Sequence, residues 1–295
     1  MSSKVMTEDE AVALIRDGDV LGLQAGPTQC APMSIVRGIL RSGVRDLTLV
    51  SLSGSLALDW FAASDAVSRV LFATATMESF GTCRHFRRGV ESGAIAAEEY
   101  SETALFARLS AGARRLPFLP TRGMLGSDLL EVGNENLAVI PDPFGGPPVV
   151  ACRALRPDVA ILHADRADVH GNIAMDPGPR SPMTTLLPRA ADRVIVSVEE
   201  IVDTEVLRAA PEQTVIPAFA VDAVVVAPFG AHPTSFFPSY DYDDRFFDAW
   251  TAVSGSREDS HAFLDAYVHR PTTHESYLDL VGRSRLDELR AMVRR

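Results

Sequence analysis

Two imidazoles and two carboxylates fall within ten residues in the stretch HADRADVHGN, which begins at His163 and ends at Asn172. Such a set can hold a metal ion, form an acid/base pair or close a turn. A zinc site takes three or four ligands in a fixed geometry, whereas these imidazoles stand seven residues apart across a Gly-Asn turn. We therefore expect no metal here, and we expect Asp168 and Asn172 to hydrogen-bond the backbone of their own turn. His163 ends an apolar run, so we expect it to face a ligand, the alternative being a packed, hydrogen-bonded histidine.

Two glutamates are the other candidates for acid/base chemistry. Glu78 follows a strand-like run and precedes Ser79 in a short loop, where it can face a cleft or bond its own turn. Glu102 follows Ser101, a residue type common at helix N-caps, so it can complement the helix dipole or act as a base. Proton transfer would require that one of these carboxylates be desolvated beside the reacting group.

The elements that position these residues follow from the apolar runs. A continuous apolar run predicts a strand buried on both faces, as in a parallel sheet. Helix-like segments lie between the strands, the first of them with a capping box at Thr7 and Glu10. The predicted strands are 20–23, 47–52, 70–73, 159–163, 194–198 and 223–227, and the predicted helices follow Thr7 and Pro32 and cover 83–92 and 102–114. We therefore predict the α/β class, with an open, mostly parallel sheet and helices on both faces.

The loops that follow the predicted strands mark a cleft. Ligands of open parallel sheets bind outside the carboxyl ends of the strands. Glycine there lets the backbone approach a ligand closely and present N–H groups to an anion. The candidate contacts in these loops are Gly26, Thr28, Ser53, Gly54, Glu78, Ser79 and His163. We expect the cleft to take a small acidic or acyl ligand.

Composition and charge exclude several classes of protein. The chain has 295 residues, 46% of them hydrophobic, and a formal net charge of −11. This charge repels phosphate backbones and anionic membrane surfaces, so we expect neither nucleic acid nor membrane as a partner. Three scattered cysteines, an N-terminus without an apolar core and the lack of a long apolar run predict a cytoplasmic protein.

The character of the sequence changes along the chain. We expect residues 1–233 to form the α/β domain, and residues 234–295 to form a helical C-terminal extension packed on it. Helices are expected near 245–253, 260–269 and 283–294. Residues 133–148 are rich in Gly, Pro and Asn and predict a long surface loop within the domain.

Six blocks, in order along nearly the whole chain, carry a family resemblance. They are SKVMT (3–7), EYS (99–101), LPFLP (116–120), PDVAILH (157–163), VDAVVVAPFGAHP (221–233) and YDYD (240–243). Together they resemble the A (alpha) subunit of family I CoA-transferases, in particular the glutaconate CoA-transferase type. The resemblance implies the NagB/RpiA/CoA-transferase-like α/β fold.

The same resemblance implies an enzyme component that moves CoA from an acyl-CoA to a carboxylic acid. In that family the thioester is attacked by a glutamate of a separate B subunit, and the enzymes are commonly A2B2 heterotetramers. Coenzyme A is then substrate and product, and no bound cofactor is expected. The family's Ser-Glu-Asn-Gly nucleophile motif is not found here, because Asn134-Glu135-Asn136 is followed by Leu137. This chain alone is therefore expected to be an incomplete enzyme.

The loop after the first strand has an expected role in that chemistry. In relatives it supplies backbone N–H groups to the thioester oxyanion. Here it reads Ala25-Gly26-Pro27, and proline has no N–H. Gly26 is the expected donor, with Thr28 or Gln29 as substitutes.

Two other functions stay open. Steroid-ring-opening hydrolases are similar A and B assemblies that cleave a C–C bond in a cyclic acyl-CoA, and a glutamate of their A component is thought to act as the base. Local alignment puts Glu102 at that position. The third possibility is a non-catalytic partner subunit that keeps the fold. The transferase is the interpretation that we favour.

Overall fold

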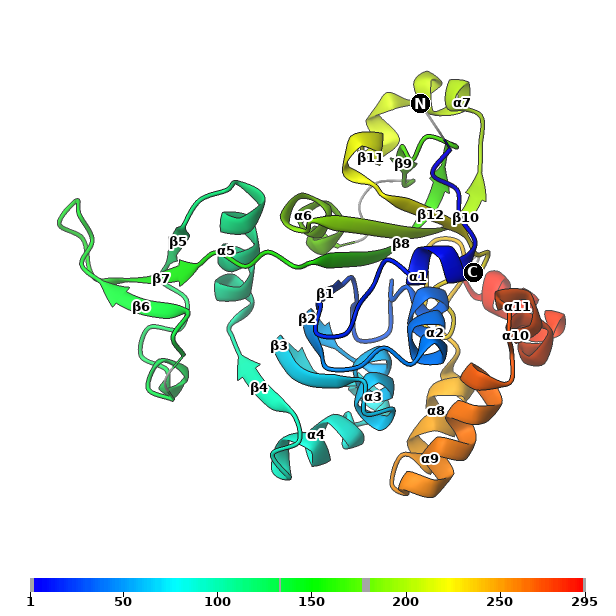
Figure 1. Cartoon of the computed structure of the whole chain (residues 1–295), viewed down its shortest axis with the longest axis horizontal. Helices are drawn as coiled ribbons and strands as arrows, with labels where there is room; N and C mark the ends of the chain where they lie inside the picture. The colour runs from blue at the N-terminus through cyan, green and yellow to red at the C-terminus, as the bar shows by residue number, and fades with distance from the viewer. Residues whose placement is uncertain (1–2, 133, 177–180, 294–295) are drawn as a thin grey trace.

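Parallel strands form most of the main sheet in the computed structural model, which describes residues 3–132, 134–176 and 181–293 (Figure 1). Among the described residues this sheet has nine strands, and six parallel pairings join seven of them. In spatial order they are β12 (Ala223–Val226), β10 (Arg193–Ile201), β8 (Val159–Ala167), β1 (Val20–Leu23), β2 (Leu47–Gly54), β3 (Val67–Ala75) and β4 (Ala96–Glu99). The predicted α/β class and its mostly parallel sheet are confirmed.

Helices cover both faces of the sheet, as predicted. One face packs against α1 (Glu8–Val12), α2 (Met33–Ser42) and α3 (Leu56–Ala63), with α4 (Arg84–Glu91) against α3. The other face packs against α5 (Glu102–Ala113) and α6 (Pro182–Ala190). Each helix buries its apolar residues against the sheet, which is why the strands carry apolar side chains on both faces.

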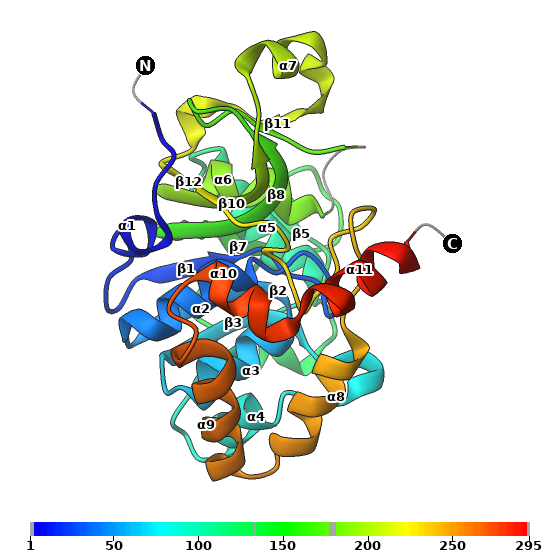
Figure 2. The same cartoon turned by 90° about the vertical axis from the view of Figure 1, so that its right-hand side faces the viewer.

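The C-terminal region is helical. It contains α8 (Asp244–Val253), α9 (Arg257–Leu264), a π-helical turn (Asp265–His269), α10 (His274–Val281) and α11 (Arg283–Met292). Trp250 of α8 packs edge-on against Trp60 of α3, with the ring centroids 6.0 Å apart. The helices therefore share the core of the sheet (Figure 2). The predicted boundary at residue 233 stays a prediction, and Arg294, the predicted end of the last helix, lies outside the described residues.

A small second sheet forms an arm that leaves the body of the molecule (Figure 1). It is antiparallel, in the order β5 (Phe118–Thr121), β7 (Val149–Arg153) and β6 (Leu137–Ile140), with a short 3-10 helix η2 (Asp128–Leu130) before β6. The segment 133–148, predicted as a long surface loop, contains the strand β6, a four-residue apolar run that pairs with β7. Gly133 lies outside the described residues. Val132 and Phe144 of the arm are 82% and 94% exposed.

The carboxyl ends of β8 and β10 extend beyond the rest of the sheet. There β9 (Ile173–Ala174) and β11 (Thr214–Ile216) add antiparallel pairs, next to α7 (Thr204–Ala209) and the 3-10 helices η3 (Pro211–Gln213) and η4 (Ala218–Ala220). The turn between β8 and β9 is built on Asp168, which accepts hydrogen bonds from the N–H groups of His170 and Asn172 and from the hydroxyl of Thr204. The predicted turn role of Asp168 is confirmed. The side chain of Asn172 instead donates to Asp168 and accepts from the N–H of Ala218, which lies outside the turn.

Candidate active site at the strand ends

The loop after β1 presents two N–H groups that have no acceptor among the described residues. They belong to Thr28, which is half-buried, and Gln29, which is exposed. The N–H of Gly26 instead donates to the carbonyl oxygen of Gln29 at 2.8 Å, inside the loop. The prediction that Gly26 is the donor therefore does not hold in this conformation, and the candidate donors are Thr28 and Gln29.

Loops from neighbouring strands hold this segment in place. The hydroxyl of Ser55 donates to the carbonyl of Pro27, and the hydroxyl of Ser53 accepts from Thr74 of β3 at 2.9 Å. The carbonyl of Gly54 accepts from the N–H of Thr76 at 2.9 Å. The structure thus brings the predicted contacts Ser53 and Gly54 beside the loop after β1, where Gly26 and Thr28 lie, although both serine hydroxyls are already hydrogen-bonded.

Glu78 and Ser79 lie on the exposed 3-10 turn η1 (Glu78–Phe80) that follows β3. The N–H of Glu78 donates to the hydroxyl of Thr76, and Phe80 stacks on Phe247 of α8 with the centroids 4.9 Å apart. Phe80 anchors the turn, so Glu78 and Ser79 face solvent near the carboxyl ends of β2 and β3. Their role as substrate contacts stays a prediction.

Glu102 begins helix α5 and is exposed. Ser101 caps the helix, because its hydroxyl accepts from the N–H of Ala104 at 3.2 Å. The Glu102 carboxylate forms no hydrogen bond or ion pair with another described residue, so its position fits the favourable interaction of an acid with a helix N-terminus. Its role as a base stays a prediction.

His163 does not line a cleft. Its side chain is 0% exposed, Nδ1 lies 2.9 Å from the hydroxyl of Ser197, and Nε2 lies 2.8 Å from Oε1 of Glu199. The prediction of a ligand-facing His163 thus does not fit the structure, whereas the alternative of a packed, hydrogen-bonded histidine does. The physical reason is that β8 continues to Ala167, so His163 lies within the sheet rather than at the strand end.

Four residues form a polar cluster that the sequence patterns did not reveal as a unit; we call His163, Ser197, Glu199 and Tyr240 the Glu199 network. The hydroxyl of Tyr240 donates to Oε1 of Glu199 at 3.1 Å, and the N–H of Phe229 donates to Oε2 at 2.9 Å. Burial, followed by the nearby Glu199 carboxylate, raises the pKa of Tyr240 well above its usual value, so its hydroxyl stays protonated. The only feature of the sequence that could have pointed to this network is Glu199, which is the first acidic residue after an apolar run.

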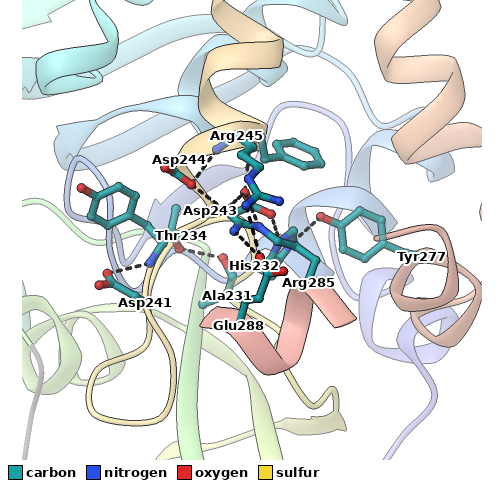
Figure 3. A network of polar contacts seen from close by, with 12 residues as sticks. Ala231, His232, Thr234, Asp241, Asp243, Asp244, Arg245, Tyr277, Arg285 and Glu288 are labelled. Atoms are coloured by element: carbon teal, nitrogen blue, oxygen red, sulfur yellow. Dashed lines mark hydrogen bonds and ion pairs between the residues drawn. The ribbon is translucent and has the colours of Figure 1, made fainter. Parts of the chain in front are cut away.

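A second cluster fastens the C-terminal helices to the segment after β12 (Figure 3). Asp243, at the start of α8, accepts from Arg285 of α11 at 2.7 Å and contacts Nε2 of His232 at 3.1 Å. The hydroxyl of Tyr277 lies 2.7 Å from Nδ1 of His232. Burial acts to raise the pKa of Asp243, but the hydrogen bonds from His232 and Arg285 outweigh it and hold this pKa far below its usual range. The cluster stabilises the fold and is buried away from solvent.

An open cavity of about 850 Å³ lies along the edge strand β4; we call it the edge cavity. Its apolar lining includes Phe72, Phe86 and Val90, and it reaches Ala75 and Glu99, the last residues of β3 and β4. None of the site residues predicted from the sequence lines it.

The charged side chains of the edge cavity are largely paired. Arg69 contacts Glu98 at 2.5 Å, and Arg87 contacts Glu91 at 2.8 Å. Both arginines that line the cavity are therefore neutralised by carboxylates of the same lining.

The cysteines do not provide a nucleophile. Cys30, Cys83 and Cys152 are buried. Burial raises the pKa of Cys152 to about 11 and that of Cys83 still further, which keeps these two thiols protonated. Among the described residues no three His, Cys, Asp or Glu side chains converge on a possible metal site, and none of the described helices is long and apolar enough to cross a membrane.

Comparison with known proteins identifies the family. Residues 5–227 match the family described as coenzyme A transferase. The chain is 34% identical to the A subunit of glutaconate CoA-transferase from Acidaminococcus fermentans, over 98% of this chain and 95% of that protein. It matches the crystal structure of the glutaconate coenzyme A-transferase from this organism with a TM-score of 0.91 and 32% identity, covering 97% of this chain and 95% of the other. The chain belongs to the coenzyme A transferase family, so the resemblance drawn from the six sequence blocks is confirmed.

Other relatives differ in name and length. The chain is 34% identical to the cholesterol ring-cleaving hydrolase IpdA subunit of Mycobacterium tuberculosis, over 91% of this chain and 94% of that protein. It is also 36% identical to an uncharacterized protein of Archaeoglobus fulgidus over 98% of this chain, but it spans only 65% of that protein. Identity is thus the same to the named transferase and to the named hydrolase, and sequence similarity alone does not separate the two chemistries.

Proposed function

We propose that this chain is the A subunit of a cytoplasmic, heteromeric CoA-transferase whose nucleophilic glutamate comes from a separate B subunit. The observation that carries the proposal is the loop after β1, where Thr28 and Gln29 present N–H groups without acceptors among the described residues. Beside this loop the hydroxyls of Ser53 and Ser55 are hydrogen-bonded, and no described histidine or carboxylate contacts either of them as a base. The chain thus offers donors for an oxyanion without an activated nucleophile.

The proposed reaction begins when a carboxylate oxygen of the glutamate from the B subunit adds to the thioester carbon. The C=O electron pair moves to oxygen, and the N–H groups of Thr28 and Gln29 donate to the resulting oxyanion. The intermediate then expels the CoA thiolate and leaves a mixed anhydride. The thiolate attacks the glutamyl carbonyl and releases the first acid, which leaves CoA on the glutamate as a thioester. A second carboxylic acid reverses these steps and departs as its CoA thioester.

We place the acyl group of the substrate in the edge cavity. The thiol of Cys83, which lines the cavity, contacts the carbonyl of Ser55 at 3.6 Å, so the cavity adjoins the loop after β2. Its lining combines apolar side chains with charged ones, and its arginines are paired with Glu91 and Glu98. This supports a largely neutral acyl group, because a second carboxylate would find no unpaired cation among the described lining residues of this chain.

The arm supports the proposal that a partner subunit is present. Val132, Val139 and Phe144 of the arm are 82%, 55% and 94% exposed, whereas large apolar side chains are normally buried. Relatives are named as A subunits or come from two-component enzymes such as the decarboxylase AibA/AibB. We propose an A2B2 heterotetramer as the complete enzyme.

Trapping of the covalent intermediate tests this proposal. The chain is co-expressed with its B-type partner, the complex is incubated with an acyl-CoA, and hydroxylamine or borohydride is added. We expect mass spectrometry to find a modified glutamate on the partner, in amounts that depend on acyl-CoA. Turnover without any such modification would contradict the transferase mechanism.

A ring-opening hydrolase is the second candidate. The observation that favours it is the exposed carboxylate of Glu102 at the start of α5, just after the edge strand β4. In this alternative Glu102 acts as a base on a cyclic acyl-CoA. The Glu102→Gln variant described below separates the two candidates.

A further inference from the structure

The Glu199 network lies where two strands of the sheet end and two continue. In the sheet register, Leu23 of β1 pairs with Ile161 of β8, and Val226 of β12 pairs with Val198 of β10. Strands β1 and β12 end there, while β8 and β10 continue for several residues. Side chains on the continuing strands therefore flank the loops that leave β1 and β12.

Glu199 holds the beginning of the segment after β12. Its Oε2 accepts from the N–H of Phe229, whose φ of +57° is a backbone conformation that bulky L-residues rarely adopt. A Cβ atom added to Gly230 would lie 2.7 Å from Cε1 of His163, so the next residue packs directly on the network. The carboxylate of Glu199 thus holds the backbone turn at Phe229, although the positive φ of Phe229 is unfavourable for this residue type.

Tyr240 closes the same segment. Its hydroxyl donates to Glu199 and accepts from the N–H of Ala231 at 3.0 Å. Its carbonyl accepts from the N–H of Phe236 at 3.0 Å. The carboxylate of Glu199 therefore fastens both ends of the segment 229–240.

This segment in turn holds the loop after β1. The N–H of Ser235 donates to the carbonyl of Thr28 at 2.8 Å, and the N–H of Cys30 donates to the carbonyl of Ser235 at 2.9 Å. The hydroxyl of Thr234 accepts from the N–H of Ala31 at 3.2 Å. These bonds fix the peptide planes on both sides of Gln29, and hence the direction of the Gln29 N–H. The Thr28 N–H lies in the preceding peptide plane, whose carbonyl, that of Pro27, accepts from the hydroxyl of Ser55.

We infer that Glu199 is a positioning residue for the loop after β1, and most directly for its oxyanion donor Gln29, an inference that rests on the proposed CoA transfer. It acts through Phe229, Tyr240 and the segment that follows β12. Its side chain is 16% exposed and its oxygens accept bonds from protein groups, so it does not act on the substrate itself. Donors displaced by a fraction of an ångström stabilise a transition state less well, while the edge cavity proposed for the acyl group stays unchanged.

Three variants test the inference. Glu199→Ala removes the carboxylate that accepts from Phe229 and Tyr240. Glu199→Gln keeps an acceptor for Phe229 and leaves the network partly paired. Glu200→Ala is the control, because Glu200 is an exposed neighbour for which no side-chain hydrogen bond is found within the described residues. Hydrogen exchange on the full chain follows the amides of Phe229, Ala231, Cys30 and Ser235. We expect exchange at least about tenfold faster in Glu199→Ala, an intermediate rate in Glu199→Gln and the wild-type rate in Glu200→Ala.

Kinetics on the complex with the B subunit provide the functional measurement. For Glu199→Ala we expect kcat to fall about tenfold or more, KM for the acyl-CoA to change less than about threefold, and Glu199→Gln to recover part of the rate. Exchange equal to that of Glu200→Ala, or a rise in KM at unchanged kcat, would overturn the inference. If the wild-type complex transfers no CoA, the proposed function fails, whereas the exchange rates still report whether Glu199 holds the two segments.

Discussion

The Glu199 network and the edge cavity belong to the same sheet but are built in opposite ways. In the network the histidine, serine, glutamate and tyrosine are packed together, and the polar groups of His163, Glu199 and Tyr240 bond one another or the backbone. Beside the edge cavity, strand β4 has a largely exposed face, and the arginine of the Arg87–Glu91 ion pair is 68% exposed. The Glu199 network holds its side chains and the neighbouring backbone in one arrangement, whereas the edge cavity leaves open space beside the sheet.

This difference matches the two demands of the proposed reaction. An oxyanion needs donors that hold still, because a preorganised donor costs nothing to reorient during the reaction. An acyl group needs room, which an open sheet edge with an apolar lining can provide. We therefore expect changes near the network to act on the rate and changes at the edge cavity to act on substrate choice.

Removing an oxyanion donor should give the largest effect. Thr28→Pro deletes one N–H, and a lost donor of this kind typically costs about a hundredfold to a thousandfold in kcat. Thr28→Ala keeps the N–H and should stay within about threefold of wild type. The measurement is kcat of the complex with the B subunit for both variants. Equal rates in Thr28→Pro and wild type would exclude the Thr28 N–H as an oxyanion donor.

Asp59 is expected to make the wall of the edge cavity sensitive to pH. It lies on α3, is buried and accepts from the N–H groups of His85 and Phe86 and from the indole of Trp250. Burial raises the pKa of Asp59 to about 6, against the lowering effect of these hydrogen bonds. A carboxyl whose pKa is raised by folding favours the folded state below its unfolded pKa, and this contribution is lost as the pH rises through about 6.

The measurement is the free energy of unfolding in urea at pH 4, 5.5 and 7.5. Relative to Asp59→Asn, the wild type should lose about 2.5 kcal/mol between pH 4 and 7.5, because a pKa difference of roughly two units is worth about 1.4 kcal/mol per unit and a small part is already lost at pH 4. Asp65→Asn, on an exposed ion pair with Arg257, is the matched control and should change stability by less than about 1 kcal/mol throughout. If the difference in the free energy of unfolding between wild type and Asp59→Asn did not change with pH, protonation of Asp59 would not affect how it holds the start of α4.

Filling the edge cavity should change the preference among acyl groups. Ala97 lines the cavity, so Ala97→Phe should raise KM about tenfold for a long, neutral acyl-CoA and leave acetyl-CoA within about twofold. Ala94→Phe, an exposed substitution outside the edge cavity, is the control. Equal effects of Ala97→Phe on both donors would place the acyl group elsewhere.

Glu102→Gln should have the smallest effect. In the transferase mechanism Glu102 is a helix-terminal residue, and replacement of such a charge costs about 0.3–1 kcal/mol of stability without changing turnover more than about twofold. Abolished turnover in an intact complex would instead support the ring-opening hydrolase. The readouts are initial rate and the amount of assembled complex.

The packed parts of this fold were predictable from local patterns. Buried strands such as Leu47–Gly54 are apolar on both faces, so the class of the sheet follows from the sequence. The strand β6 was not predicted, because its four apolar residues stand among Gly, Pro and Asn and owe their extended form to pairing with β7.

The site was predictable only in part. The loops after the strands identify Thr28 and Ser53 by position, yet the donor set changed once the N–H of Gly26 proved to be bonded to Gln29. His163 was misplaced because a histidine after apolar residues looks like a strand end, whereas the strand continues to Ala167. Glu199 and Tyr240 lie 41 positions apart, and only the fold brings them together.

The most direct test of the account compares CoA transfer by this chain alone, by its B-type partner alone and by the two together. The account predicts transfer only by the mixture, since this chain provides the oxyanion donors and the partner provides the attacking carboxylate. Transfer by the isolated chain at the rate of the mixture would contradict it.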